Sequence, residues 1–302
     1  MKLLITGGSG NLGKVISKLA IERNHSVNIL TRNKNLNSTN KNCNFFYWNP
    51  LESEIDLECF SGVDSVINLA GSNVFNYWTN SHKKKILNSR VNSSNFILKT
   101  IFEKQIDIKS FVSASGIAAY KDSRIEVSNE DDLIINEDSF INKVVTNWET
   151  EVLDFKKILP NTSFSILRIG LILSNNGGLY KITKNLSKFF LLTPLGRGDQ
   201  WQSWIHISDA ANMFIKCAEN NFNGIFNVVS TKPVTQNELI MKIAKYNKSK
   251  IIFPNIPEFI VKIFFGEMSE LVLSSQKVIS KKSSEFNLKF QDIDEALKDL
   301  SQ

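Results

Sequence analysis

The chain has 302 residues, of which 42% are hydrophobic and 22% charged, and it carries a formal net charge of +6. These values are ordinary for a globular protein with a substantial core. The basic residues are scattered along the chain rather than clustered, so we expect no nucleic-acid partner. The most apolar later stretch, 259–265, is far too short to cross a bilayer, so we expect no membrane insertion.

Cysteine usage indicates a reducing compartment. The three cysteines, Cys43, Cys59 and Cys217, are isolated from one another, and their number is odd. No cluster of His, Cys and Asp has metal-ligand spacing, so we expect no metal. The first residues lack a charged segment followed by an apolar core, and we therefore predict a cytoplasmic protein. A homodimer or a protein partner stays open.

The first 30 residues predict a strand, a helix and a second strand. The apolar run 2–6 indicates a buried strand, the glycine-rich turn 7–13 opens a helix, and 27–30 forms the next strand. Such a turn lets the backbone approach a pyrophosphate, whose charge is held by the helix N-terminus. The dinucleotide-binding residues expected here are Gly7, Gly8, Ser9, Gly10, Asn11, Leu12 and Gly13.

Strand-like and helix-like segments then alternate, which predicts an α/β fold with a doubly wound parallel sheet. Further strands are expected at 45–48, 64–71, 110–116, 164–173, 204–207 and 225–229, and long helices at 80–104 and 141–158. The acidic segment 126–138 is predicted to be a surface loop.

Two domains are expected. Residues 1–235 are predicted to form a Rossmann domain that binds NADP(H), with substrate-cleft segments from 174–205. Residues 236–302 are predicted to form a small, mostly helical C-terminal lobe, whose boundary is marked by the helix breakers Pro254 and Pro257.

The end of the second strand favours NADP(H) over NAD(H). An acidic residue there would accept hydrogen bonds from the ribose 2′-hydroxyl, whereas this strand ends at Thr31 and Arg32 with no carboxylate nearby. An arginine can pair with a 2′-phosphate, although an exposed loop cation would look the same. The segment 68–71 is expected at the adenosine half of the cofactor, unless it is only a strand-ending turn.

Several segments together resemble the extended and atypical short-chain dehydrogenase/reductase superfamily. More narrowly, the chain is similar to an "epimerase family" subgroup that ends in a short domain of unknown function. The matching segments are 6–13, 48–50, 66–71, 78–79, 89–91, 113–116, 148–149, 203–207 with Asp209, 233–235, 266–267 and 276–278.

The resemblance implies that further residues outside the glycine turn face NADP(H). These are Thr31 and Arg32 at the 2′-phosphate, Leu69 and Ala70 at the adenosine half, Lys85 and Arg90 on the long helix, and Ile172 on the nicotinamide side. Gly71 is expected at the adenosine half from its place in the segment 68–71.

The chain departs from the superfamily at the catalytic helix. Active members use a tyrosine as general acid/base and a lysine four residues later. Here Val144 and Trp148 are expected at those two positions. The catalytic candidates that remain are Ser115, which could orient a substrate carbonyl, and Tyr120, which is more often structural in this superfamily. His206 is expected to be structural, with Ser208 or Asp209 as a helix N-cap.

Two functions follow from this pattern. The first is an NADP(H)-dependent oxidoreductase or nucleotide-sugar-epimerase-like enzyme acting on a small-molecule substrate, because hydride chemistry belongs to the cofactor. The second is a non-catalytic protein that senses NADP(H) and regulates a partner, since some members of the subgroup are labelled cell-division factors.

Overall fold

A parallel sheet forms the centre of the molecule. The computed structural model describes residues 1–36, 40–132 and 139–302. The strands of its largest sheet follow the order β12-β8-β6-β5-β1-β2-β3-β4, and every neighbouring pair is parallel except β3 and β4. Their bounds are β1 (Lys2–Thr6), β2 (Ser26–Thr31), β3 (Cys43–Asn49), β4 (Glu54–Ile55), β5 (Ser65–Asn68), β6 (Ser110–Gly116), β8 (Ser163–Ile169) and β12 (Gly224–Val228). The predicted doubly wound α/β fold is confirmed.

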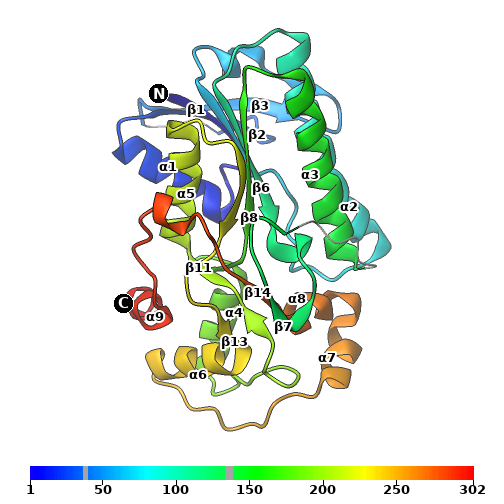
Figure 1. Ribbon diagram of the computed structural model, residues 1–302, viewed down its shortest axis with the longest axis vertical. Helices are drawn as coiled ribbons and strands as arrows, with labels where there is room; N and C mark the ends of the chain where they lie inside the picture. Colours follow the sequence, from blue (N-terminus) through cyan, green and yellow to red (C-terminus); the bar gives the residue numbers. More distant parts are fainter. Residues whose placement is uncertain (37–39, 133–138) are drawn as a thin grey trace.

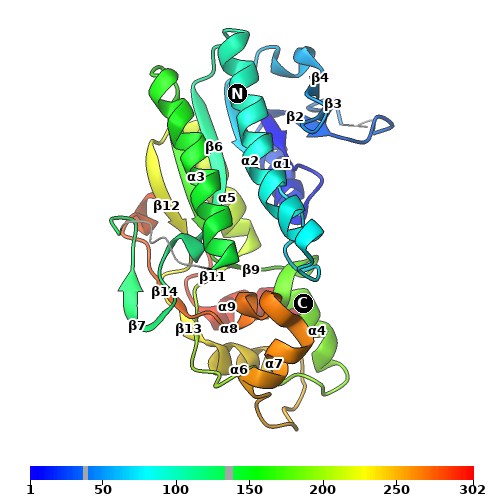
Figure 2. The ribbon, with the colours of Figure 1, turned by 90° about the vertical axis from the view of Figure 1, so that its right-hand side faces the viewer.

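Long helices cover both faces of this sheet. The helices α1 (Asn11–Glu22) and α5 (Ile207–Glu219) pack together on one face, and α2 (Asn80–Glu103) and α3 (Phe140–Ile158) on the other (Figures 1 and 2). Strands covered on both faces are apolar throughout rather than alternating. Accordingly Leu3, Leu4 and Ile5 of β1 are fully buried.

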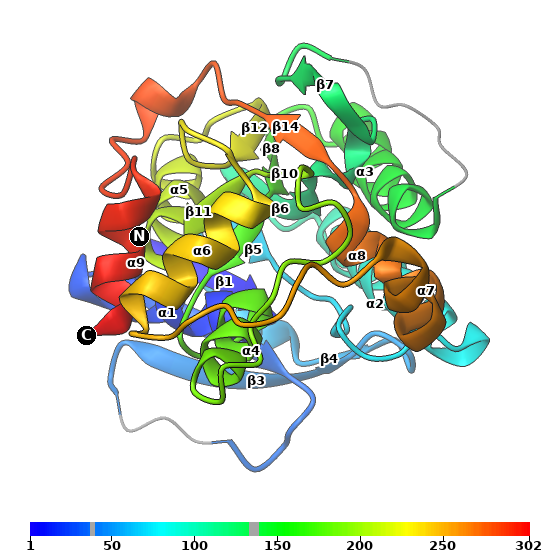
Figure 3. The same ribbon diagram turned by 90° about the horizontal axis from the view of Figure 1, so that it is seen from below.

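Smaller elements lie beyond the main sheet, at the bottom of Figure 1 and in front in Figure 3. The helices there are α4 (Gly178–Ser187), α6 (Gln236–Tyr246), α7 (Glu258–Phe265), α8 (Glu270–Leu273) and α9 (Ile293–Ser301). Three strand pairs accompany them: β9 (Leu171–Leu173) with β11 (Trp204–His206), β10 (Trp201–Gln202) with β13 (Val234–Thr235), and β7 (Ser123–Ser128) with β14 (Gln276–Val278). Within the described residues, no helix has the length and apolar character that a membrane span needs.

Two predicted segments differ from the structure. The strand expected over 164–173 is divided at Gly170, where a Cβ atom would lie 2.1 Å from the carbonyl oxygen of Ser203. This close approach lets β9 leave the main sheet and pair with β11. In the predicted loop 126–138, residues 126–128 instead belong to β7, because β14 pairs with it. Residues 133–138 lie outside the described residues.

The C-terminal segment is tied to the main domain. Phe286 and Leu288 pack in the hydrophobic core of the large sheet. Asp209, one of the two residues expected to cap α5, instead accepts hydrogen bonds from the backbone N–H groups of Lys289 and Phe290, at 3.0 and 2.8 Å. The N-cap of α5 is His206, whose Nδ1 accepts from the N–H of Ser208 at 3.2 Å. The domain boundary at residue 235 stays a prediction.

Candidate cofactor and substrate site

Two adjoining cavities lie around the carboxyl ends of the central strands. The first, of about 620 Å³, is lined by Gly7, Ser9 and Gly10 and is called the glycine-turn cavity below. The second, of about 610 Å³, is lined by Ser115 and is called the Ser115 cavity. Ser72 lines both. Together they form an elongated site at the edge where open α/β sheets bind ligands.

The glycine turn is shaped by close backbone packing. Gly7 has a φ of +66°, and a Cβ atom there would lie 2.7 Å from the carbonyl oxygen of Leu69. A Cβ at Gly13 would lie 2.4 Å from the carbonyl oxygen of Gly7. The N-cap of α1 is Gly10, which supplies no side-chain acceptor to the first-turn N–H groups. These N–H groups are therefore suited to an anionic ligand.

The structure brings most of the predicted cofactor residues to the two cavities. Gly7, Ser9, Gly10, Thr31, Arg32, Leu69, Ala70, Gly71 and Lys85 line the glycine-turn cavity, and Asn11, Leu12, Arg90 and Ile172 line the Ser115 cavity. Gly8 and Gly13 line neither. A Cβ at Gly8 would lie 2.7 Å from the side chain of Ile29, so both glycines serve the packing of α1 against the sheet.

The glycine-turn cavity is cationic. Among the described residues that line it, Arg32 and Lys85 are the charged ones, and neither is accompanied by a carboxylate in that lining. Arg32 is exposed directly after β2, while Thr31 is buried and its Oγ1 accepts the N–H of Asn33 at 3.1 Å. This end of the site therefore suits a phosphate group.

Lys85 and Arg90 serve different cavities, because a separation of five residues turns two side chains away from each other on a helix. The Nη1 of Arg90 donates to the carbonyl oxygens of Ser72 and Ile86, at 3.2 and 3.0 Å. Its guanidinium lies 5.4 Å from the ring centre of Trp148. Burial lowers the pKa of Arg90 to about 10, so the side chain stays cationic at neutral pH.

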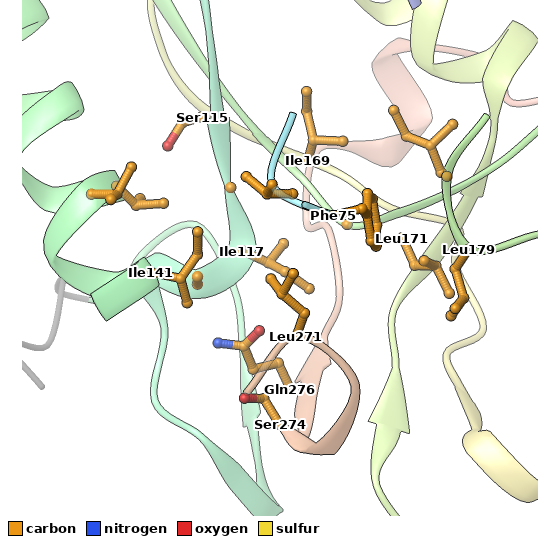
Figure 4. A pocket seen from close by; sticks show the side chains of 18 of the residues that line it. Phe75, Ser115, Ile117, Ile141, Ile169, Leu171, Leu179, Leu271, Ser274 and Gln276 are labelled. Atoms are coloured by element: carbon orange, nitrogen blue, oxygen red, sulfur yellow. The ribbon is translucent and has the colours of Figure 1, made fainter. Parts of the chain in front are cut away.

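The Ser115 cavity is largely apolar. Figure 4 shows Ser115 at one end and Ser274 and Gln276 at the other, with Ile141 and Leu271 among the apolar side chains between them. Val144 and Trp148 also line this cavity from α3. Neither can act as a general acid or base at neutral pH.

Ser115 belongs to a buried polar network that the sequence analysis did not anticipate. Its Oγ donates to Oε1 of Glu149 at 2.5 Å. Glu149 also pairs with Arg168 through two hydrogen bonds, of 2.9 Å from Nε and 2.8 Å from Nη2. Both side chains of this pair are 1% exposed. The sequence does contain an indication of this network. Arg168 interrupts an otherwise apolar strand, and a charge buried in such a strand requires a partner of opposite charge.

Tyr120 lies apart from the cavity. It is 1% exposed, its hydroxyl donates to Oδ1 of Asn227 at 2.8 Å, and its ring centre lies 4.7 Å from the guanidinium of Arg168. Burial raises the pKa of this hydroxyl above its usual range. Tyr120, one of the two predicted catalytic residues, therefore does not contact the space where a substrate would bind.

Comparison with known proteins identifies the family. The protein-family model described as "NAD dependent epimerase/dehydratase family" matches residues 3–228. The chain belongs to this family. A second model, "Domain of unknown function (DUF1731)", matches residues 256–300. The predicted resemblance to an epimerase subgroup with such a C-terminal segment is confirmed.

Relatives align over the full length of the chain. Epimerase family protein YfhF of Bacillus subtilis is 31% identical, covering 99% of this chain and 98% of that protein. Mouse epimerase family protein SDR39U1 is 28% identical, covering 99% of each. The crystal structure of human SDR39U1 with NADPH has a TM-score of 0.87 at 26% identity, covering 100% of this chain and 99% of that one. The fold of UDP-N-acetylglucosamine 4-epimerase from Bacillus cereus is also similar, with a TM-score of 0.78 at 18% identity, and the match covers 100% of this chain and 98% of that one.

Proposed function

We propose that this protein is an NADP(H)-dependent oxidoreductase that acts on a small molecule held in the Ser115 cavity. The observation that carries this proposal is the pair of adjoining cavities, one cationic beside a glycine turn and the other apolar and of substrate size. The human relative solved with NADPH supports the same cofactor, which agrees with the prediction from Arg32.

The residues present fit NADP(H). Arg32 and Thr31 would hold the 2′-phosphate, and the uncapped first turn of α1 would hold the pyrophosphate. Leu69 and Ala70 would face the adenosine half, and Ile172 the nicotinamide side. When bound, this cofactor supplies or accepts a hydride.

The chain's own contribution is positioning and exclusion of water. Ser115 orients the substrate oxygen, while Val144 and Trp148 close the side on which the superfamily places its tyrosine and lysine. No tyrosine lines the described part of this cavity, and its carboxyl groups, Asp122 and Glu270, lie at the end away from Ser115. The proton that accompanies each hydride is therefore exchanged with water. We therefore expect turnover to be slow compared with that of members that retain the tyrosine.

A second candidate is a non-catalytic NADP(H)-sensing regulator, with a link to cell division. One observation favours it: Val144, which is expected at the position of the superfamily's tyrosine, lines the cavity with an aliphatic side chain. The extent of the Ser115 cavity favours the enzyme, because its lining continues past Ile172, on the nicotinamide side, to Ser274 and Gln276, where no cofactor residue is expected.

The test is NADPH consumption against a panel of carbonyl compounds, and NADP⁺ reduction against the corresponding alcohols. Ser115→Ala and Tyr120→Phe form a matched pair, because each removes one buried hydroxyl that donates to a side-chain oxygen, and only Ser115 lines the cavity. We expect turnover to fall in Ser115→Ala and to persist in Tyr120→Phe. Cofactor binding without turnover of any compound would favour the regulator.

A further inference from the structure

We infer that the Ser115 cavity takes an uncharged, mainly apolar molecule whose hydroxyl or N–H group faces Ser115, and that it does not take a nucleoside-diphosphate sugar. This inference rests on the proposed function, in which the Ser115 cavity is the substrate site. Three independent features of the cavity carry it.

The first feature is the apolar wall. Four apolar residues of the lining are labelled in Figure 4: Ile117, directly after β6, Ile141 from α3, Ile169 from β8 and Leu271 from α8. Val145 from α3 also lines the space. Burying apolar ligand surface against such side chains contributes roughly 25 cal/mol per Å². A sugar, whose surface carries many hydroxyl groups, would lose water against these apolar side chains without gaining hydrogen bonds from them.

The second feature is the balance of charge. Among the described residues lining the cavity, the ionisable ones are Arg90, Asp122 and Glu270. The two carboxylates are held at the end away from Ser115, where Asp122 accepts the N–H of Ser275 at 2.8 Å and Glu270 accepts from the hydroxyl of Ser139. Diphosphate recognition needs several cationic or N–H donors, and carboxylates repel it.

Arg90 alone does not provide the several cationic donors that a diphosphate would need. Its Nη1 is engaged by two backbone carbonyl oxygens, and its guanidinium lies over the ring of Trp148, at the junction with the glycine-turn cavity. A sugar diphosphate in the Ser115 cavity would therefore meet one cation at the cofactor end and two carboxylates at the other.

The third feature is the direction of the Ser115 hydroxyl. A serine hydroxyl has one hydrogen and two lone pairs. Here the hydrogen is donated to Glu149, and Arg168 holds that carboxylate in place through two hydrogen bonds. Ser115 thus offers the cavity an acceptor, so its ligand presents a donor. An alcohol fits this arrangement better than the corresponding ketone.

The test uses a matched alcohol and ketone that differ only in this donor. Binding of 1-(2-naphthyl)ethanol, 2-acetylnaphthalene and UDP-glucose is measured by calorimetry with the full chain saturated with 1,4,5,6-tetrahydro-NADP, a reduced analogue that cannot transfer a hydride. All three titrations then use the same cofactor form, and none contains turnover. We expect the alcohol to bind about fivefold more tightly than the ketone, as one neutral hydrogen bond predicts, and UDP-glucose not to bind.

Two variants assign the preference to Ser115. In Ser115→Ala the alcohol and ketone should bind equally. Ser113→Ala is the control, because Ser113 lies on the same strand, is 1% exposed and does not line the cavity. Binding of UDP-glucose, equal binding of both naphthyl probes by the unaltered chain, no binding of the alcohol, or a preference that survives Ser115→Ala would each overturn the inference. Failure of NADPH itself to bind would instead refute the proposed function.

Discussion

Arg168 on β8 and Glu149 on α3 form a buried ion pair joined by two hydrogen bonds, of 2.9 and 2.8 Å. Each side chain is 1% exposed. The pair links a strand of the central sheet to the helix that covers it. Because Glu149 also accepts the hydroxyl hydrogen of Ser115, the pair fixes which hydrogen-bonding group the cavity receives. A contact that stabilises the fold thereby also sets the chemistry of the site.

Removal of the carboxylate should destabilise the fold strongly. Glu149→Ala leaves the Arg168 cation buried without a partner, and we expect a loss of about 3–5 kcal/mol in the free energy of unfolding. The control is Glu22→Ala, which breaks an exposed pair with Lys18 at 3.8 Å and should cost less than about 1 kcal/mol. Urea denaturation measures both. Similar losses for the two variants would contradict the role assigned to the buried pair.

The preference for NADPH should depend on Arg32. Without its guanidinium the 2′-phosphate loses a charge-assisted contact, so Arg32→Ala should weaken NADPH binding about tenfold and leave NADH binding almost unchanged. Lys34→Ala is the matched control, because it removes the same charge two residues away. Lys34 lies 4.2 Å from the ring centre of Tyr47 and does not line the glycine-turn cavity. Equal losses for both nucleotides in Arg32→Ala would refute the 2′-phosphate assignment.

The glycine turn should not tolerate a side chain at its last glycine, Gly13. The added methyl group in Gly13→Ala would lie 2.4 Å from a backbone oxygen of Gly7, which cannot move without opening the turn. We expect a loss of about 1–3 kcal/mol in unfolding free energy and weaker NADPH binding. In Gly116→Ala the nearest atom, on Val145, lies 3.4 Å away, so stability should be unchanged. Thermal unfolding with and without NADPH compares the two variants.

Stability should fall as the pH decreases below about 6.5, in part because of His206. Burial lowers the pKa of this imidazole, an effect that Lys289 adds to and that Asp299 and Asp209 oppose. The unfolded chain therefore binds a proton at a pH where the folded chain does not, which favours unfolding. The contribution of neutral His206 to the free energy of unfolding is complete above the ordinary pKa of histidine. It is lost as the pH falls below that value. His206→Asn, which retains a capping acceptor, should lose less stability than the unaltered chain between pH 7.5 and 5.5 in urea denaturation.

Much of the fold could be predicted from local sequence patterns. The first strand could be predicted because a buried parallel strand is apolar throughout. The turn after it could be predicted because glycines mark the close approach of α1. The long helices were readable from their periodicity. The division at Gly170 was not, because it depends on Ser203, which is distant in sequence and approaches only in the folded chain.

The candidate site was predictable only in part. Residues near strand ends, such as Arg32 and Ser115, could be placed because parallel strands present their carboxyl ends at one edge. The partner of Ser115 could not be identified, because the contact between Glu149 and Arg168 joins a helix to a strand through tertiary packing. The carboxylates Asp122 and Glu270 were missed for the same reason, because Asp122, just before β7, and α8 are brought to one cavity only when the C-terminal segment folds back.

One NADP(H) molecule should span both cavities. The most direct measurement is a crystal structure of this chain with NADPH bound. We expect the 2′-phosphate within hydrogen-bond distance of Arg32 and the nicotinamide ring in the Ser115 cavity, beside Ile172. A nicotinamide ring directed away from the Ser115 cavity, or a 2′-phosphate remote from Arg32, would contradict the account.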